Sequence, residues 1–261
     1  MSIDLDGAGV VITGGGRGIG AALARSLAGQ GARVVVADLD ADGANAVAGE
    51  VGGTAVAGDV ASEQGVRALV AEARTALGEI DLFCANAGVA PHGGPDAAEE
   101  AWALAWEVNV MAHVRAAREL LPAWLDRGRG HFLATVSAAG LLTSLGSAPY
   151  SVSKHGALAF AEWLSATYRH RGITVQAVCP QGVRTKMLAD TGTAGQLIMG
   201  ATAIEPEQVA DACLAGLRDG RFLILPHPEV ADYYAVRATQ TDRWLGGMNK
   251  LQRKVEHEAG G

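Results

Sequence analysis

Cysteine is scarce in this sequence, and its placement limits the chemistry that it can support. The 261 residues include three cysteines, Cys84, Cys179 and Cys213, which lie far apart and form no CxxC pair. Metal sites and disulfide frameworks usually show closely spaced cysteines. We therefore expect no metal site and no disulfide. Cys84 and Cys179 stand in apolar, strand-like runs, where cysteine behaves as a small hydrophobic residue.

Long apolar runs and an excess of positive charge are missing too. No apolar stretch approaches the roughly 18 residues that cross a membrane, and the first residues, Met1 to Asp6, lack the basic region of a signal peptide. The 21 lysines and arginines against 28 acids give a net charge of −7, which argues against nucleic acid as a partner. The basic run at 169–171 is most simply a solvated helix C-terminus. These absences predict a cytoplasmic protein with neither a membrane nor a nucleic-acid partner.

What is present is an alternation of short apolar runs with longer segments of helical period. Hydrophobic residues make up 49% of the chain, enough for a large core. Strands alternating with helices predict an α/β fold, with a doubly wound parallel sheet covered by helices on both faces, in a single domain over residues 1–261. The seven expected strands are Gly9–Thr13, Arg33–Asp38, Thr54–Ala57, Ile80–Ala85, Gly130–Ser137, Ile173–Cys179 and Phe222–Leu225. The expected helices lie near 18–29, 41–51, 62–77, 97–126, 150–171 and 205–219.

Two segments do not follow this alternation of strands and helices. One spans residues 183–204 and mixes glycine and threonine with apolar side chains. A long loop is rare in a compact domain unless it is functional, so we expect it to cover the substrate, the alternative being a mobile surface connection. The other is a C-terminal extension from about residue 226, with a possible helix from about Glu229.

A glycine-rich loop follows the first expected strand and opens directly into an alanine-rich helix. Glycine lets the backbone approach a pyrophosphate, which then rests on the N–H groups at the helix start. The G-x-G-x-x-G/A pattern at Gly16, Gly18 and Ala21 is weak alone, but its position between strand and helix is informative. We expect dinucleotide contacts here rather than a plain glycine turn, from the loop residues Gly14, Gly16, Arg17, Gly18, Ile19 and Gly20.

Asp38 ends the second expected strand, twenty residues after Gly18. An acid at this place can accept hydrogen bonds from the adenosine ribose hydroxyls and repels a 2′-phosphate. Arg17 is counter-evidence, because a guanidinium can bind a phosphate. The sequence favours NAD over NADP as the cofactor.

Tyr150 and Lys154 lie four residues apart on an expected helix, so their side chains share one face. A phenol has a pKa near 10 and is a poor base at neutral pH, but a nearby cation stabilises the phenolate. Such a pair can exchange a proton with an alcohol or ketone while hydride moves to or from a nicotinamide. Ser137 closes the fifth expected strand, at the sheet edge where ligands bind. Asn109 is a polar residue flanked by apolar ones, which requires a partner or a role.

Together these residues resemble the short-chain dehydrogenase/reductase family, in its single-domain branch with a Rossmann-type fold, from about Gly7 to Gly220. The family's TGxxxGxG motif stands at Thr13, Gly14, Gly18 and Gly20. Its Asn-Ala-Gly motif stands at Asn86, Ala87 and Gly88, its adenine contact at Asp59 and Val60, and its catalytic tetrad at Asn109, Ser137, Tyr150 and Lys154.

The resemblance implies a role for each tetrad residue. Tyr150 would be the general acid/base, and Ser137 would hold the substrate oxygen. Lys154 would bind the nicotinamide ribose and lower the pKa of Tyr150, while Asn109 would anchor a water in a proton relay. Tyr150 and Lys154 also count as cofactor contacts, and further contacts to the nicotinamide end are implied for Pro180, Gly182, Val183 and Thr185.

Three departures from the family pattern stand out. Ala85 replaces a frequent asparagine before the Asn-Ala-Gly motif. Gln181 interrupts the usual Pro-Gly pair after the sixth strand. The tail reads Leu225-Pro226-His227-Pro228 in place of the family's Asp-Gly-Gly ending, which weakens the case for a tail-mediated tetramer but not for a dimer built from the fourth and fifth helices. We expect a homodimer or homotetramer.

Apolar residues near the tetrad predict a pocket for a moderately hydrophobic secondary alcohol or ketone. The candidates are Leu141, Leu142, Leu145, Met187 and Leu188. His92 could reach a substrate but is more simply a solvated loop residue, while Trp102, Leu104 and Trp106 have the spacing of core or dimer-face packing.

The same fold is compatible with two other functions. A non-catalytic NAD-binding regulatory protein on the same fold is an alternative, although such a protein needs no Tyr–Lys pair. An epimerase or dehydratase with bound NAD is disfavoured, because those relatives add a larger substrate domain. The sequence predicts an NAD(P)-dependent alcohol dehydrogenase/ketone reductase.

Overall fold

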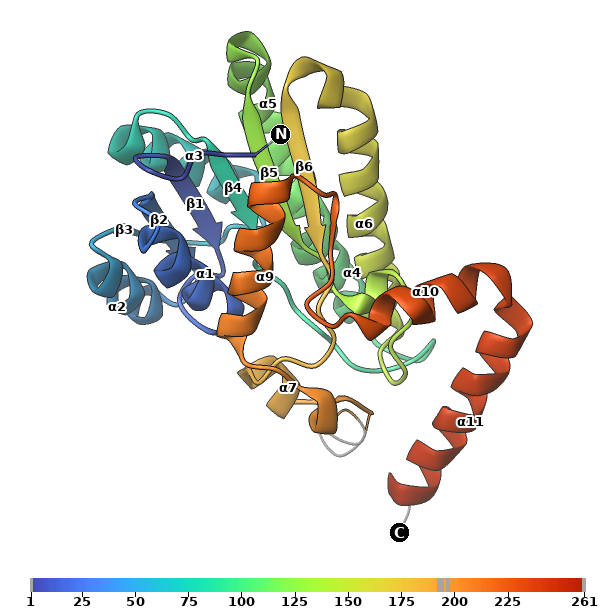
Figure 1. The fold of residues 1–261 in the computed structure, drawn as a ribbon. Helices are drawn as coiled ribbons and strands as arrows, with labels where there is room; N and C mark the ends of the chain where they lie inside the picture. Colours follow the sequence, from blue (N-terminus) through green and yellow to red (C-terminus); the bar gives the residue numbers. More distant parts are fainter. Residues whose placement is uncertain (1, 192–194, 196–197, 260–261) are drawn as a thin grey trace.

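A seven-stranded parallel sheet forms the centre of the molecule, in the order β3-β2-β1-β4-β5-β6-β7 (Figure 1). The computed structural model describes residues 2–191, 195 and 198–259. The strand order reverses between β1 and β4, which are hydrogen-bonded neighbours. The strands are β1 (Gly9–Thr13), β2 (Arg33–Asp38), β3 (Thr54–Ala57), β4 (Leu82–Ala85), β5 (Gly130–Thr135), β6 (Ile173–Val178) and β7 (Leu223–Ile224). The predicted doubly wound parallel sheet is confirmed.

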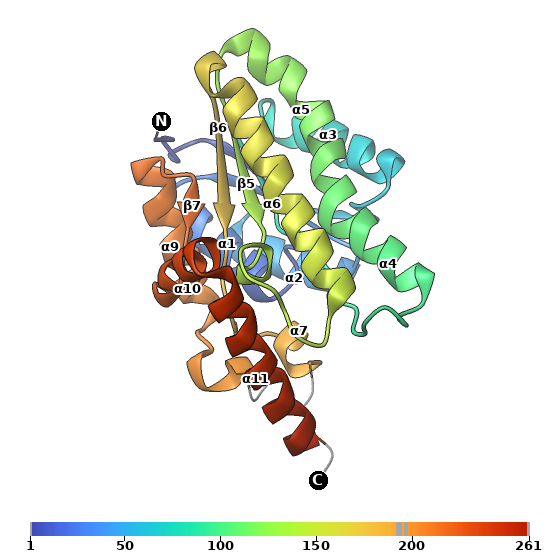
Figure 2. The ribbon, with the colours of Figure 1, turned by 90° about the vertical axis from the view of Figure 1, so that its right-hand side faces the viewer.

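Helices cover both faces of the sheet and define two cores (Figures 1 and 2). Buried residues of α1, α2 and α9 pack on one face, and buried residues of α3, α5, α6 and α10 pack on the other. The α-helices are α1 (Gly18–Ala28), α2 (Ala41–Val51), α3 (Glu63–Leu77), α4 (Glu99–Trp106), α5 (Ala112–Arg127), α6 (Ala148–Tyr168), α7 (Lys186–Ala189), α9 (Pro206–Asp219), α10 (Glu229–Thr239) and α11 (Thr241–Ala259). The central strands β1, β4, β5 and β6 are buried throughout, as a parallel sheet covered on both faces requires.

The helix predicted over residues 97–126 was wrong as one regular helix. A π-helical turn, Glu107–Met111, separates α4 from α5, so the α-helical hydrogen-bond ladder widens there by one residue. Such turns commonly mark functional sites, and this one contains Asn109.

Several strand ends also differ from the sequence prediction. β5 ends at Thr135, short of Ser137, because the backbone at Ser137 has φ 149° and leaves the strand conformation. β4 begins at Leu82 rather than Ile80, and β6 ends at Val178 rather than Cys179. β7 comprises Leu223–Ile224 only. The three cysteines are free and buried.

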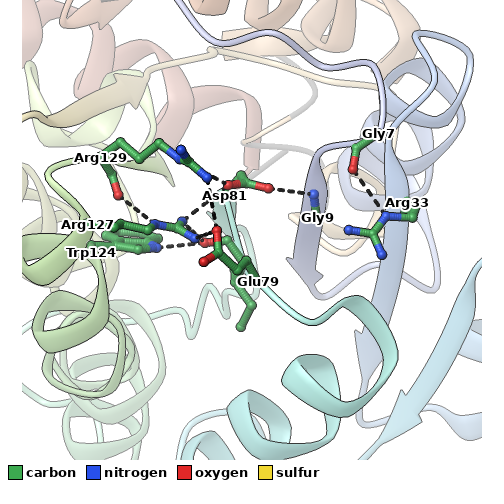
Figure 3. Close-up of polar contacts among 9 residues, drawn as sticks. Gly7, Gly9, Arg33, Glu79, Asp81, Trp124, Arg127 and Arg129 are labelled. Carbon is green, nitrogen blue, oxygen red and sulfur yellow. Dashed lines mark hydrogen bonds and ion pairs between the residues drawn. The ribbon is translucent and has the colours of Figure 1, made fainter.

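A cluster of charged side chains links the amino ends of the central strands β1 and β4 (Figure 3). Arg127, the last residue of α5, pairs with Glu79 and Asp81 and donates to the carbonyl of Ile80. The other carboxylate oxygen of Asp81 accepts the backbone N–H of Gly9, at 2.9 Å. The cluster therefore joins β1, β4 and the end of α5 at the edge of the sheet opposite the strand carboxyl ends.

The C-terminal extension forms the predicted helix and a second one. α10 packs through Val230, which is fully buried, and Arg237 of α10 lies 5.7 Å from the ring centre of Trp244 in α11. Figure 2 shows α11 continuing beyond the body of the fold. Over the described residues, no helix combines the length and apolar character needed to cross a membrane.

Candidate active site

The glycine-rich loop lies between β1 and α1, at the point where the strand order reverses. Gly14 and Gly18 adopt positive φ values of 61° and 54°, and a Cβ on Gly20 would lie 2.1 Å from the Gly14 carbonyl oxygen. The loop therefore depends on glycine at these positions.

The start of α1 fits a bound phosphate group. Its N-cap residue, Arg17, makes no side-chain cap, and no acid stands in the first turn. By contrast, Asp40 caps α2 and Ser62 caps α3. Helix starts leave N–H groups that need partners, and an anion supplies them well. The residues present fit the pyrophosphate of a dinucleotide.

Asp38 lies at the end of β2, largely buried beside the glycine loop. Its two carboxylate oxygens accept the backbone N–H groups of Gly16, at 2.9 Å, and Asp40, at 3.0 Å. The carboxylate is thus held rigidly at the place predicted for the adenosine ribose, while the neighbouring side chain of Arg17 is exposed.

Asn86 links the ends of three strands by hydrogen bonds at the carboxyl edge of the sheet. Its side-chain amide donates to the carbonyls of Thr13 and Gly14, at 3.0 and 3.1 Å, and accepts from the Thr135 hydroxyl at 3.0 Å. The Thr13 hydroxyl accepts the backbone N–H groups of Asn86 and Ala87. This network sets the spacing between the glycine loop, the segment after β4 and the end of β5.

Asn109, in the π-helical turn, is completely buried. Its side chain exchanges two hydrogen bonds with the backbone of Val89, at 3.0 and 2.9 Å, and donates to the Ser153 hydroxyl at 3.0 Å. The amide therefore joins the segment after β4 to α6.

Tyr150, Ser137 and Lys154 lie together between the end of β5 and the start of α6. The Ser137 hydroxyl lies near enough to the Tyr150 phenol to affect its ionisation, and the Lys154 ammonium lies 5.7 Å from the centre of the Tyr150 ring. Lys154 also donates to the carbonyl of Thr135, at 3.0 Å. A Cβ on Gly88 would lie 3.4 Å from this ammonium, so the Asn-Ala-Gly segment borders the same space.

Burial dominates the ionisation of this pair. It raises the pKa of Tyr150, while the nearby Ser137 side chain opposes the increase. It lowers the pKa of Lys154 to about 8. The loss of solvent around the phenol is the largest cause of the raised pKa of Tyr150.

The Pro180–Thr185 segment closes the other side of the site. The Pro180 carbonyl accepts from the backbone N–H of Ala138, at 2.8 Å, and from the Ser137 hydroxyl, at 3.5 Å. A Cβ on Gly18 would lie 3.1 Å from the Thr185 methyl carbon, so the predicted nicotinamide segment faces the glycine loop.

The predicted apolar pocket residues fall into two groups. Leu141 and Leu142 are buried in the core beneath α6 and α10, and Leu188 is buried. Leu145 is partly exposed and Met187 is 39% exposed, so these two side chains present apolar surface to solvent.

The remaining predicted residues lie around the margins of the site. Asp59 is exposed and accepts from the N–H of Ala61, while Val60 and Ile19 are packed partly against the two cores. His92 is exposed, and its Nε2 lies 3.2 Å from the Asp190 carbonyl oxygen at the end of α7.

Sequence reasoning missed Thr135. Its carbonyl receives Lys154 and its hydroxyl reaches Asn86, so it links the Tyr–Lys pair to the glycine loop. The available signal was its position, a hydroxyl residue closing a buried strand as Thr13 closes β1.

Comparison with known proteins places this geometry in a family. The profile of the family described as short chain dehydrogenase matches residues 8–195. The 1-deoxy-11-beta-hydroxypentalenate dehydrogenase of Streptomyces exfoliatus is 37% identical over 228 residues, covering 84% of this chain and 82% of that protein. The 2,5-dichloro-2,5-cyclohexadiene-1,4-diol dehydrogenase of Sphingobium indicum is 35% identical over 191 residues, covering 71% and 76%.

Solved structures of similar fold support the same family. A short chain dehydrogenase/reductase from Burkholderia phymatum in complex with NAD superposes with a TM-score of 0.85 at 27% identity, covering 92% of this chain and 96% of that one. A 7 alpha-hydroxysteroid dehydrogenase complexed with NADH and 7-oxo glycochenodeoxycholic acid gives 0.78 at 28% identity, covering 85% and 93%.

Proposed function

The chain belongs to the short-chain dehydrogenase/reductase family, and on this premise we propose that Tyr150, Ser137, Lys154 and Asn109 form its catalytic centre. It is an NAD(P)-dependent oxidoreductase that interconverts a secondary alcohol and a ketone. The observation that carries the proposed centre is the Lys154 ammonium 5.7 Å from the centre of the Tyr150 ring, with the Ser137 hydroxyl near the phenol.

Each side chain has a defined task in this proposal. Ser137 orients the substrate oxygen toward the Tyr150 phenol, which donates a proton to a ketone or accepts one from an alcohol. Lys154 binds the ribose hydroxyls and stabilises the phenolate. When bound, the nicotinamide cofactor supplies the hydride acceptor for oxidation or the hydride donor for reduction.

We further propose NAD as the preferred cofactor. Asp38 presents a rigidly held carboxylate at the end of β2, which can accept from ribose hydroxyls and repels a 2′-phosphate. Solved neighbours with NAD or NADH support this choice. Asp38→Asn should reduce the preference for NAD over NADP, because it weakens NAD binding and removes the repulsion of the 2′-phosphate. The measurement is the ratio of kcat/KM with NAD to kcat/KM with NADP.

The proposed substrate is a moderately hydrophobic secondary alcohol carried on a ring. Named relatives act on a hydroxypentalenate and a cyclohexadiene diol, and one neighbour is a hydroxysteroid dehydrogenase. Leu145 and Met187 offer partly exposed apolar surface for such a ring, and a pocket with few polar anchors suits it.

The test is a panel of alicyclic alcohols with NAD and of the matching ketones with NADH, followed by nicotinamide absorbance, on the wild type and on Tyr150→Phe. We expect turnover of apolar ring alcohols by the wild type and a loss of about a hundredfold or more in the variant, with NADH binding retained. Tyr168→Phe, a tyrosine at the far end of α6, is the matched control. Full activity in Tyr150→Phe would contradict the assignment, and faster turnover of sugars than of apolar alcohols would contradict the substrate class.

A further inference from the structure

His227 lies in the short segment between β7 and α10, between two prolines, and only 2% of its surface is exposed. The backbone N–H of Gln181 donates to its Nδ1 at 3.2 Å, and its Nε2 lies 3.3 Å from the carbonyl oxygen of Thr202. An amide N–H can only donate and a carbonyl can only accept. The ring is therefore the neutral tautomer with its proton on Nε2, and both of its nitrogens are used.

The two partners of His227 belong to segments that border the proposed site. Gln181 follows Pro180, whose carbonyl accepts from the Ser137 hydroxyl. Thr202 ends the 3-10 turn Gly200–Thr202, which forms the last part of the 183–204 segment. Gln181 and His227 were also two of the places where the sequence departs from the family pattern, and the structure joins them by a hydrogen bond.

The two described ends of the 183–204 segment meet beside Gly182; residues 192–194 and 196–197 lie outside the described residues. Val183 pairs with Ile204 as an isolated parallel bridge. A Cβ on Gly182 would lie 2.8 Å from the Met199 carbonyl oxygen, so the two segments are in close contact. His227, in the C-terminal extension, contacts one residue of each segment, Gln181 and Thr202. It therefore stabilises the contact between the two segments.

We propose that His227 is a positioning residue for substrate binding, which fixes the end of the 183–204 segment against the segment that carries Pro180. The proposal rests on the proposed function in one respect, that Met187, in the described part of this segment, contacts the substrate ring. Among the described residues, the hydrogen-bond partners of His227 are Gln181 and Thr202 and not Tyr150 or Lys154, so we expect it to affect how the substrate is held and not the proton transfer.

Three substitutions separate the two contacts of the ring. His227→Ala removes both. His227→Asn keeps an acceptor near the position of Nδ1, and His227→Gln keeps a donor near the position of Nε2. Since the Thr202 contact holds the substrate segment, we expect KM for a ring alcohol to rise about tenfold in the alanine and asparagine variants, the effect of one lost hydrogen bond. The glutamine variant should recover most of this loss, and kcat should change less than about threefold in all three.

A second readout needs no activity. Arg184 and Lys186 are exposed at the start of the 183–204 segment, and trypsin cleaves after both residue types. We expect His227→Ala to be cut there about tenfold faster than the wild type, while cleavage after Arg253 and Lys254 in α11 is unchanged. Proteolysis of local openings reports how often a segment is released.

The outcomes are distinguishable. Unchanged KM and unchanged cleavage in His227→Ala would overturn the proposal, and so would faster cleavage at all four sites, which means general destabilisation. Equal losses in the glutamine and alanine variants would overturn the role of the Thr202 contact. If the wild type turns over no alcohol, the proposed function fails, while selective cleavage at Arg184 and Lys186 still decides the structural role of His227.

Discussion

Ser137 combines a proposed chemical role with backbone strain. Among the described residues it is the only non-glycine with positive φ, at 149° with ψ 156°. That region is essentially restricted to glycine and costs about 1–3 kcal/mol for other residues. The strain brings the hydroxyl to the end of β5, where it also accepts the backbone N–H of Ala139.

The strain predicts that two substitutions of Ser137 have similar effects on activity and different effects on stability. Ser137→Ala and Ser137→Gly should both lose most activity, because neither retains the hydroxyl. The glycine variant should nevertheless be more stable than the alanine variant by about 1 kcal/mol, because glycine adopts this backbone without strain. Urea unfolding of the two variants checks it. An alanine variant at least as stable as the glycine variant would show that the backbone at this position is not strained.

His113 is the second residue whose burial has a measurable consequence. It lies on α5, almost fully buried, with its ring edge against Phe132. Burial first, and then the charge of Lys154, lower its pKa from 6.5 to about 3. A histidine with a depressed pKa in the folded state contributes stability above pH 6.5, which is lost as the pH falls toward the folded-state value.

Acid should therefore destabilise the protein partly through His113. The contribution falls by about 1.4 kcal/mol per pH unit below 6.5, or about 2 kcal/mol between pH 7 and pH 5. His113→Leu should lose correspondingly less stability over that interval in urea unfolding. His131, with a pKa lowered to about 4 by burial, keeps part of the acid sensitivity in the variant. His170→Gln, at an exposed position, should behave as the wild type; equal pH dependence in all three proteins would refute the assignment.

At the scale of elements, local patterns predicted most of the fold. The seven strands are short apolar runs with clear breaks, so their order and type followed from the sequence. Their ends did not, because β5 stops where the strained backbone of Ser137 begins, and β7 is reduced to two residues. Hydrophobic runs continue past both of these points.

The π-helical turn was beyond sequence reasoning for a different reason. Residues 97–126 have helical period throughout, and one extra residue per turn over Glu107–Met111 hardly disturbs that pattern. What selects it is tertiary: the Asn109 amide finds Val89 and Ser153 only after β4 and α6 are in place. The tetrad could be named from spacing, but not the hydrogen bonds that occupy its asparagine.

The cluster at the amino edge of the sheet gives a prediction about elements (Figure 3). The Arg127 side chain is 15% exposed and binds Glu79, Asp81 and the Ile80 carbonyl. Arg127→Met should lower the free energy of unfolding by about 1–3 kcal/mol, because partly buried acceptors lose a charged donor.

Arg129→Met is the matched control for that measurement. Arg129 binds the same Glu79, but its side chain is 68% exposed, and exposed ion pairs contribute about 0–1 kcal/mol. NADH binding should be unchanged in both variants, since the cluster lies at the sheet edge opposite the site. Equal destabilisation by the two substitutions, or weaker NADH binding in either, would contradict this account.

At the scale of the whole molecule, the site depends on segments that sequence reading treats separately. The glycine loop, the Asn86 segment and the end of β5 are distant in sequence and are joined through Thr13, Asn86 and Thr135. The order of a doubly wound sheet predicts that these edges meet. The contact of the C-terminal His227 with Gln181 follows from no local pattern, because it depends on where the chain returns after β7.

The outer surface of α4 and α6 supports the expected self-association. Leu104 of α4 and Val152 of α6 are 50% and 51% exposed, on helices that pack against each other, and exposed apolar patches commonly mark interfaces. We propose that this face joins two copies of the chain.

Leu104→Asp should shift the mass measured by light scattering toward the monomer, because a carboxylate buried there would lack a partner. Leu245→Asp, at 52% exposure on α11, should leave the mass unchanged. If instead the α11 substitution dissociates the protein and Leu104→Asp does not, the C-terminal extension forms the interface.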